Sequence, residues 1–78
     1  MNINIDIENF LKRFNDEYMF LYDNNDNVAG YHEALVEGDK FIEDHPEFIK
    51  EFVKYRGDII SSDREVAAFM FTLNDIVG

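Results

Sequence analysis

Carboxylates are the side chains in this sequence whose spacing could support catalysis. Glu33 with Glu37, and Glu47 with Glu51, stand four residues apart, which places each pair on one face of a helix. Neighbouring carboxylates can perturb each other's pKa and act as general acid and base. A catalytic site also needs a concave pocket, which a domain of 78 residues with one thin core rarely encloses. The pairs therefore indicate a solvated helix face, and we expect no enzymatic activity.

The Asn/Asp-rich segment 23–27 is the first candidate for a metal site. Asp23, Asn25 and Asn27 match the first, third and fifth positions of a calcium-binding EF-hand loop. The match then fails, because the sixth position is Val28 instead of Gly and the twelfth is Ala34 instead of Glu. The segment is therefore interpreted as a polar turn.

Histidine and cysteine give no better metal site. His32 is followed by Glu33, but no second His stands at the spacing that places two imidazoles on one helix face. His45 is the only other histidine, and the sequence has no Cys, which excludes cysteine chemistry and thiolate-bound zinc. We expect neither a metal nor a cofactor.

Net charge is the strongest functional signal. The chain has 17 acidic and 7 basic side chains, a formal net charge of -10. Such a field repels nucleic acids and anionic membranes, so we expect no direct binding to either. It attracts basic surfaces, which in a cell are mostly built to hold nucleic acid. The predicted partner contacts are Glu33, Glu37, Glu43, Asp44, Glu47 and Glu51, with Asp23 and Asp26 as a second cluster.

A helix face of carboxylates can imitate part of a phosphate track. Side chains four apart on a helix lie about 6 Å from each other, whereas a duplex strand advances about 3.4 Å per phosphate. The imitation is therefore partial. The alternative is that the acidic surface only keeps a small protein soluble.

Three aromatic residues lie off the apolar stripes of the expected helices: Phe20, Phe41 and Phe71. They either widen the core faces or are exposed, and exposed aromatics beside carboxylates are typical of a protein-binding surface, including that of a homodimer.

Hydrophobic periodicity predicts the helices that position these residues. Apolar residues at three- and four-residue steps predict a helix over about 6–22, with Asp6 or Asn4 as its cap, and a weaker one follows from Val28. Gly30 and Gly38 interrupt this second stripe. A β-hairpin that pairs residues 18–22 with 28–32 across the Asn/Asp loop is the alternative.

Capping signals predict two further helices. Asp44, followed by His45 and Pro46, suits a helix start that Gly57 later ends or bends. Ser62 with Glu65 forms a capping box, and clean helical spacing continues to Gly78. The fold class is therefore all-α, a compact bundle of about four short helices in a single domain spanning 1–78. No membrane span or signal peptide is apparent, so a cytoplasmic location is the expectation.

These observations favour a small acidic inhibitor that blocks a basic nucleic-acid-binding surface of a partner protein. Phage-encoded antagonists of host defence, of the anti-CRISPR or anti-restriction type, are a comparable class. One alternative is an immunity or antitoxin protein that neutralises a basic toxin. Another is a structural or regulatory helical module, such as a homodimer, whose acidity serves solubility.

Overall fold

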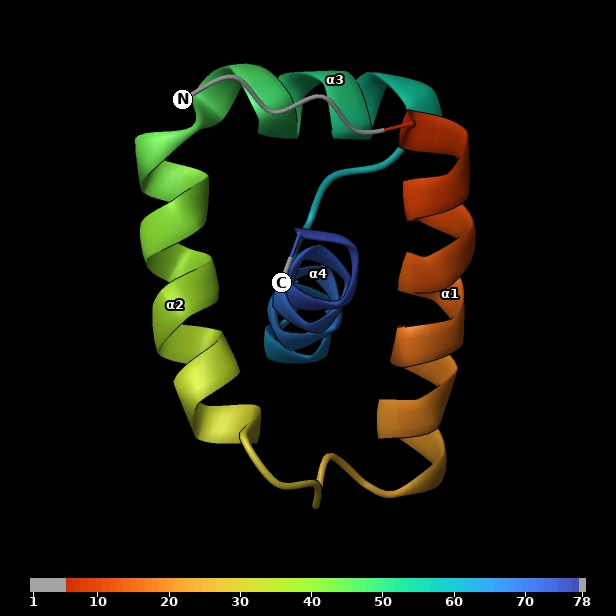
Figure 1. Ribbon diagram of the computed structural model, residues 1–78, viewed down its shortest axis with the longest axis vertical. Helices are drawn as coiled ribbons and strands as arrows, with labels where there is room; N and C mark the ends of the chain where they lie inside the picture. The colour runs from red at the N-terminus through yellow and green to blue at the C-terminus, as the bar shows by residue number, and fades with distance from the viewer. Residues whose placement is uncertain (1–5, 78) are drawn as a thin grey trace.

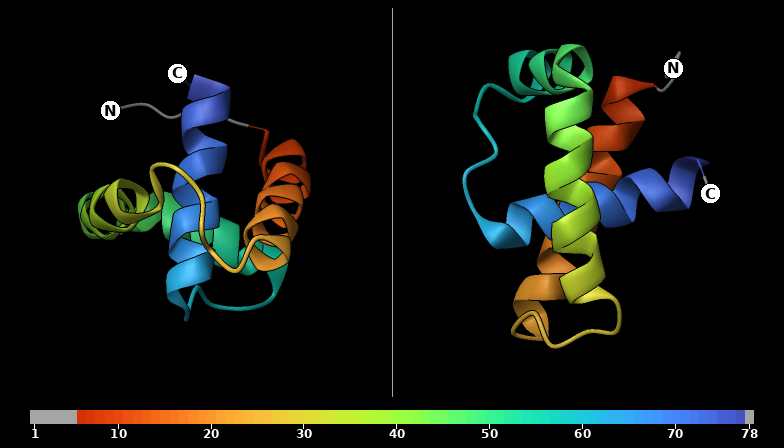
Figure 2. Two further views of the ribbon diagram at one scale, coloured as in Figure 1. Left: turned by 90° about the horizontal axis from the view of Figure 1, so that it is seen from below. Right: turned by 90° about the vertical axis from the view of Figure 1, so that its left-hand side faces the viewer.

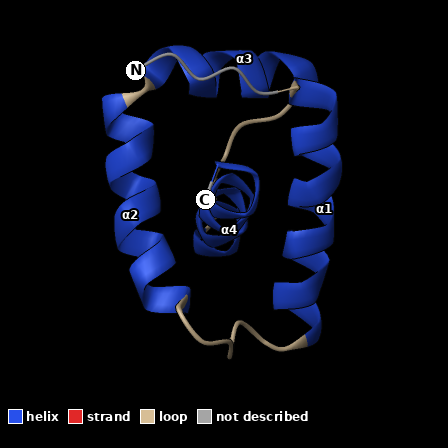
Figure 3. Ribbon diagram, in the orientation of Figure 1, coloured by secondary structure: helices blue, strands red, loops and turns tan. Residues whose placement is uncertain are grey.

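Four α-helices make up most of the structure, a computed structural model that describes residues 6–77 (Figure 1). They are α1 (Ile7–Asp23), α2 (Tyr31–Asp44), α3 (Pro46–Arg56) and α4 (Asp63–Val77). Between residues 6 and 77 there is no strand (Figure 3). The prediction of an all-α bundle is confirmed.

The fourth helix crosses between the other three. Helices α1 and α2 run along two sides of the molecule, α3 spans one end, and α4 passes between α1 and α2 at a steep angle (Figure 2). Helix α4 packs against both α1 and α2, and α3 packs against both of these as well. The core therefore lies around α4, and the outer sides of α1 and α2 face solvent on opposite sides of the molecule.

Helix α1 has nearly the predicted bounds. The Asp6 side chain accepts a hydrogen bond from the backbone N–H of Glu8 at 3.1 Å and caps the helix; Asn4 lies outside the described residues. After Asp23 the chain turns through Asn25 and Asp26, which have positive φ angles of 53° and 64°. Asn and Asp tolerate this left-handed conformation better than other non-glycine residues.

The hairpin alternative is wrong. Residues 18–22 belong to α1, because the apolar stripe that buries Phe10 and Phe14 continues to Leu21 one turn before the loop. Residues 28–30 are a loop that leads into α2. The Asn/Asp segment therefore joins two helices instead of two strands.

Gly38 lets α2 and α4 approach closely. A Cβ atom at Gly38 would lie 2.6 Å from Cγ1 of Val66 and 3.1 Å from the Val66 carbonyl oxygen. Any other residue type would require the Val66 side chain or α4 to shift. The glycine that weakens the predicted stripe is the point at which the two helices pack.

The boundary between α2 and α3 corrects one prediction. Asp44 is the last residue of α2 and not the cap of α3; His45 occupies that position and makes no side-chain cap hydrogen bond. Pro46 imposes the break, because the residue before a proline is disfavoured in helical conformation, and His45 has φ -130° and ψ 61°. Gly57 ends α3 in the left-handed conformation, with φ 83°, as predicted.

The capping box at the start of α4 is confirmed. The Glu65 N–H donates to Ser62 Oγ at 3.2 Å, and the Ser62 N–H donates to Glu65 Oε1 at 3.1 Å. Helix α4 continues to Val77; Gly78 lies outside the described residues.

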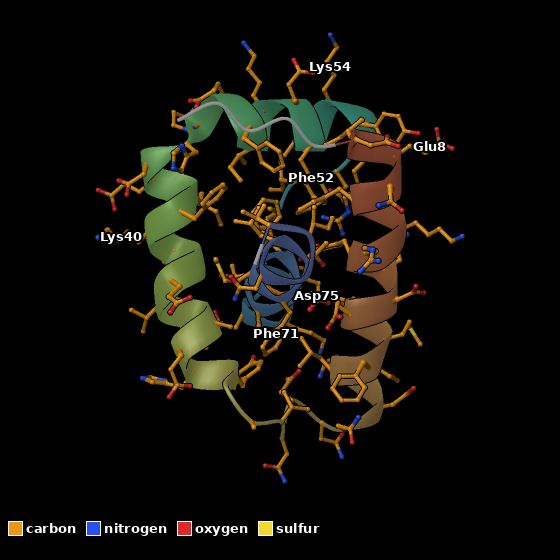
Figure 4. The ribbon with its side chains drawn as sticks, viewed as in Figure 1. Glu8, Lys40, Phe52, Lys54, Phe71 and Asp75 are labelled. Atoms are coloured by element: carbon orange, nitrogen blue, oxygen red, sulfur yellow. The ribbon has the colours of Figure 1, made fainter. Side chains whose placement is uncertain are left out.

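Aromatic rings fill the core. Phe69 of α4 lies 5.0 Å from the ring centroid of Phe10, 5.3 Å from that of Phe52 and 5.7 Å from that of Phe41. Tilted and edge-on contacts of this kind add to the stabilisation from burial alone. Phe52 points into the interior from α3 (Figure 4).

Candidate partner-binding surface

At one end of the molecule, the segments of α1 and α2 and the loop that joins them carry acidic side chains and no Lys or Arg. Residues 14–39 comprise the last ten residues of α1, the loop and the first nine residues of α2, and extend from the lower end in Figure 1 to about mid-height. We call this the acidic end. Its carboxylates are Asp16, Glu17, Asp23, Asp26, Glu33, Glu37 and Asp39.

The structure brings together half of the predicted partner contacts. Asp23 and Asp26 were predicted as a separate cluster, but the loop places them at the same end as Glu33 and Glu37. Asp23, Glu33 and Glu37 are exposed, whereas Asp26 is half-buried. The acidic end is thus continuous across α1, the loop and α2.

The other four predicted contacts lie toward the opposite end: Glu43, Asp44, Glu47 and Glu51. Helix α3 carries two acidic and three basic residues, and its exposed face places Glu47 and Glu51 beside Lys50 and Lys54. Lys54 extends outward from α3, as Lys40 does from α2 (Figure 4). We call residues 6–13 and 40–56 the mixed end; they carry six acidic side chains, Glu8 of α1 among them, and six basic ones, so charge is balanced there. A role for the four predicted carboxylates of this end in a partner interface stays a prediction.

Helix α2 presents its carboxylates in two rows. At about 100° per residue, Glu33, Glu37 and Asp44 share one flank, and a separate row follows the other flank of the exposed side. That second row contains Asp39 and Glu43. Glu33 and Glu37, four residues apart, are about 6 Å from each other, whereas Asp44 lies about 10 Å further along the helix. The closely spaced part of the first row therefore belongs to the acidic end.

Arg64 of α4 reaches the acidic end and is fully engaged there. Its Nε and Nη2 atoms donate to Oδ1 and Oδ2 of Asp26 at 2.8 and 3.1 Å. Its guanidinium carbon lies 5.7 Å from the ring centroid of Tyr18 and 5.1 Å from that of Tyr22. The hydrogen bonds to Asp26 raise the pKa of Arg64. Asp26 therefore fixes the loop to α4, and its carboxylate is occupied within the fold.

Glu17 meets a second carboxyl group, Asp75, where α1 and α4 pack together. Burial raises the pKa of Glu17 to about 7, and the hydrogen bond with Asp75 and the charges of Asp75 and Asp16 act in the same direction, while Arg13 opposes them. Asp75 lies on the solvent-facing part of α4 near its end (Figure 4). The Glu17 carboxyl group therefore gains or loses its proton near neutral pH.

Glu65 serves the fold instead of the surface. It is 7% exposed, and it accepts hydrogen bonds from Arg56 Nη2, the backbone of Ser61 and Ser62, and both serine hydroxyls. Burial favours the neutral acid, but these donors outweigh it and keep the pKa of Glu65 below its usual value. The sequence identified its capping role and missed its ion pair with Arg56.

The acidic end has four large exposed apolar side chains, three on α1 and one on α2. Met19, Phe20 and Tyr22 of α1 are 51%, 53% and 56% exposed, and Val36 of α2 is 59% exposed. Of the three aromatics predicted to lie off the stripes, only Phe20 is exposed; Phe41 is buried and Phe71 is half-buried. Met19, Tyr22 and Val36 were missed, although their positions opposite the buried stripe could have indicated them.

A metal site is not evident in the described part of the chain. Residues 6–77 contain no group of three or more His, Cys, Asp or Glu side chains that could hold a metal ion. One hollow on their surface is lined by Ile7, Glu51, Lys54 and Tyr55. None of the described helices has the length and apolar character needed to cross a bilayer.

No protein-family model matches this chain, and neither curated proteins nor solved structures show a match to it.

Proposed function

We propose that this protein is a non-enzymatic inhibitor whose acidic end occupies a basic nucleic-acid-binding surface of a partner protein. The observation that carries the proposal is the charge distribution: residues 14–39 contain seven carboxylates and no Lys or Arg, on two helices held rigidly at one end of the molecule. A concentrated field of one sign accelerates association with an oppositely charged surface more than evenly spread charge does.

The carboxylates of α2 are available to a partner. The ion pairs among residues 6–77 involve Glu47, Glu65 and Asp26, and none of them uses a carboxylate of α2. An unengaged carboxylate can replace a phosphate as the acceptor for Arg or Lys. Solubility alone does not require that charge be concentrated at one end, since interspersed charges of both signs serve it equally.

The biological setting we propose is antagonism of host defence in the cytoplasm, by a phage-encoded protein of the anti-CRISPR or anti-restriction type. CRISPR effector enzymes, for example, hold their nucleic acids in a positively charged channel. A partial imitation of phosphate spacing is enough for competition, because affinity for such grooves is largely electrostatic.

Competition for nucleic acid tests the proposal. A partner captured on the immobilised wild-type chain is purified, loaded with labelled duplex DNA or RNA, and titrated with the free chain. The proposal predicts release of the nucleic acid by the wild type and little release by Glu33→Gln/Glu37→Gln. A complex in which the partner holds the chain and the nucleic acid together would contradict it, as would a partner that binds no nucleic acid.

A further inference from the structure

The exposed apolar side chains at the end of α1 spread over the solvent side of the helix, among carboxylates. We define the α1 patch as Met19, Phe20 and Tyr22, each about half exposed in the last two turns of the helix. Asp16 precedes Phe20 by four residues and Asp23 follows it by three, and both aspartates are exposed. Residues at these spacings are neighbours on a helix surface, so Phe20 has a carboxylate before it and one after it along the helix.

The α1 patch takes little part in the packing of the fold itself. The core face of α1 is the stripe that contains Phe10, Phe14 and Leu21, whereas Met19 and Phe20 project from its outer side. The ring of Tyr22 is partly covered by the guanidinium of Arg64, which fixes one edge of the α1 patch. Met19 and Phe20 are then the side chains with apolar surface to bury against another molecule.

Charge decides which molecule this is. A second copy that met the α1 patch with its own patch would bring Asp16 and Asp23 against the same two aspartates, and an anionic membrane would be repelled by these charges. A basic surface gains from Asp16 and Asp23, the two exposed carboxylates that flank the α1 patch. We infer that the α1 patch inserts Met19 and Phe20 into an apolar pocket framed by Lys and Arg side chains on the partner protein.

This inference rests on the proposed function for the class of partner. It adds an apolar pocket on the partner, which a groove that binds only phosphates lacks. Carboxylates alone give fast, salt-sensitive association, whereas a buried aromatic anchor slows dissociation. The partner surface is therefore apolar at its centre and basic at its rim, and discrimination between basic partners comes from Met19 and Phe20.

Two synthetic peptides test the inference without the natural partner. One is an amphipathic helix of Lys and Leu with the leucines on one face; the other has Ser in place of each Leu and the same charge. Binding is measured at low salt for the wild type, for Met19→Gln/Phe20→Gln, and for Ile59→Gln. Ile59 is 62% exposed and lies outside the acidic end, so Ile59→Gln is the matched control.

The wild type is expected to bind the Lys–Leu peptide about tenfold more tightly than the Lys–Ser peptide, since burial of one aromatic side chain accounts for such a factor. Met19→Gln/Phe20→Gln loses this preference and keeps its affinity for the Lys–Ser peptide, whereas Ile59→Gln keeps both. In the wild type, the methyl NMR signal of Met19 shifts with the Lys–Leu peptide, a readout that needs no variant.

Equal affinity of the wild type for the two peptides, or an unchanged preference in Met19→Gln/Phe20→Gln, would overturn the inference. Failure of the proposed function gives a different result: the captured partner keeps its nucleic acid when the free chain is added, whatever the peptides show.

Discussion

Arg64 and Asp26, 38 residues apart in the sequence, form a two-point ion pair that closes the acidic end, with N···O distances of 2.8 and 3.1 Å. The pair draws the α1–α2 loop onto the first turn of α4. It also removes from the surface the basic side chain that would otherwise compete for the neighbouring carboxylates.

Asp26→Asn is expected to loosen this loop without dissolving α1 or α2. Asn tolerates the positive φ of residue 26 and retains the turn, so the substitution removes only the charge-assisted pair. The expected result is faster amide hydrogen exchange in residues 24–30 and a lower melting temperature. Asp23→Asn, at an exposed position with no ion pair, is the control. Equal exchange in the two variants would show that the pair does not hold the loop.

Gly38→Ala should destabilise the protein although Ala has the higher helix propensity. The added Cβ would lie 2.6 Å from Cγ1 of Val66, and overpacking of this kind costs about 1–3 kcal/mol in the free energy of unfolding. Urea unfolding measures the loss, and Val66→Ala in the same chain should restore part of it. A Gly38→Ala protein as stable as the wild type would mean that α2 and α4 are not in tight contact there.

Removal of the Glu65 carboxylate should be the most damaging single polar change. In Glu65→Ala, Arg56 loses its buried partner and two serine N–H groups lose their acceptor, for a loss of about 3 kcal/mol in unfolding free energy. Since the pKa of Glu65 is lowered in the folded protein, its contribution is present above about pH 4.5 and is lost as the pH falls through the folded value. Asp63→Asn, exposed on the same turn, should change stability little.

For Glu17 we expect the opposite pH dependence of the free energy of unfolding. Its pKa is raised to about 7 in the folded protein, so its stabilisation is complete below the unfolded value of 4.5 and is lost as the pH rises through 7. With allowance for solvent screening, we expect a loss of about 1 kcal/mol between pH 5 and pH 8. Glu17→Gln should remove this difference in urea unfolding, whereas His32→Gln, at an exposed position of α2, should not. An identical pH profile for wild type and Glu17→Gln would rule out a shared proton with Asp75.

The sequence predicted the helices because local signals and hydrophobic periodicity agreed. Asp6, Gly57 and the Ser62–Glu65 box were recognisable because capping depends on residues close in sequence. The role of Asp44 was misjudged because α2 continues through Asp44, up to the break that Pro46 imposes.

Long-range features were not accessible in this way. The close approach at Gly38 depends on Val66, and the Asp26–Arg64 pair depends on how α4 crosses the molecule. The division into an acidic end and a mixed end follows from the antiparallel course of α1 and α2, which brings Asp23 and Glu33 together and leaves Glu47 among lysines. The sequence therefore indicated an acidic surface but not its position.

The affinity of the captured partner for two matched charge variants tests the central claim most directly. The acidic-end variant combines Asp16→Asn, Asp23→Asn, Glu33→Gln and Glu37→Gln. The mixed-end variant combines Glu8→Gln, Asp44→Asn, Glu47→Gln and Glu51→Gln. Both remove four negative charges, so a nonspecific effect of net charge would weaken them equally. We predict that the acidic-end variant loses at least about tenfold in affinity at low salt and most of its salt dependence, while the mixed-end variant stays close to the wild type. Equal losses in the two variants, or none in either, would contradict the assignment of partner binding to the acidic end.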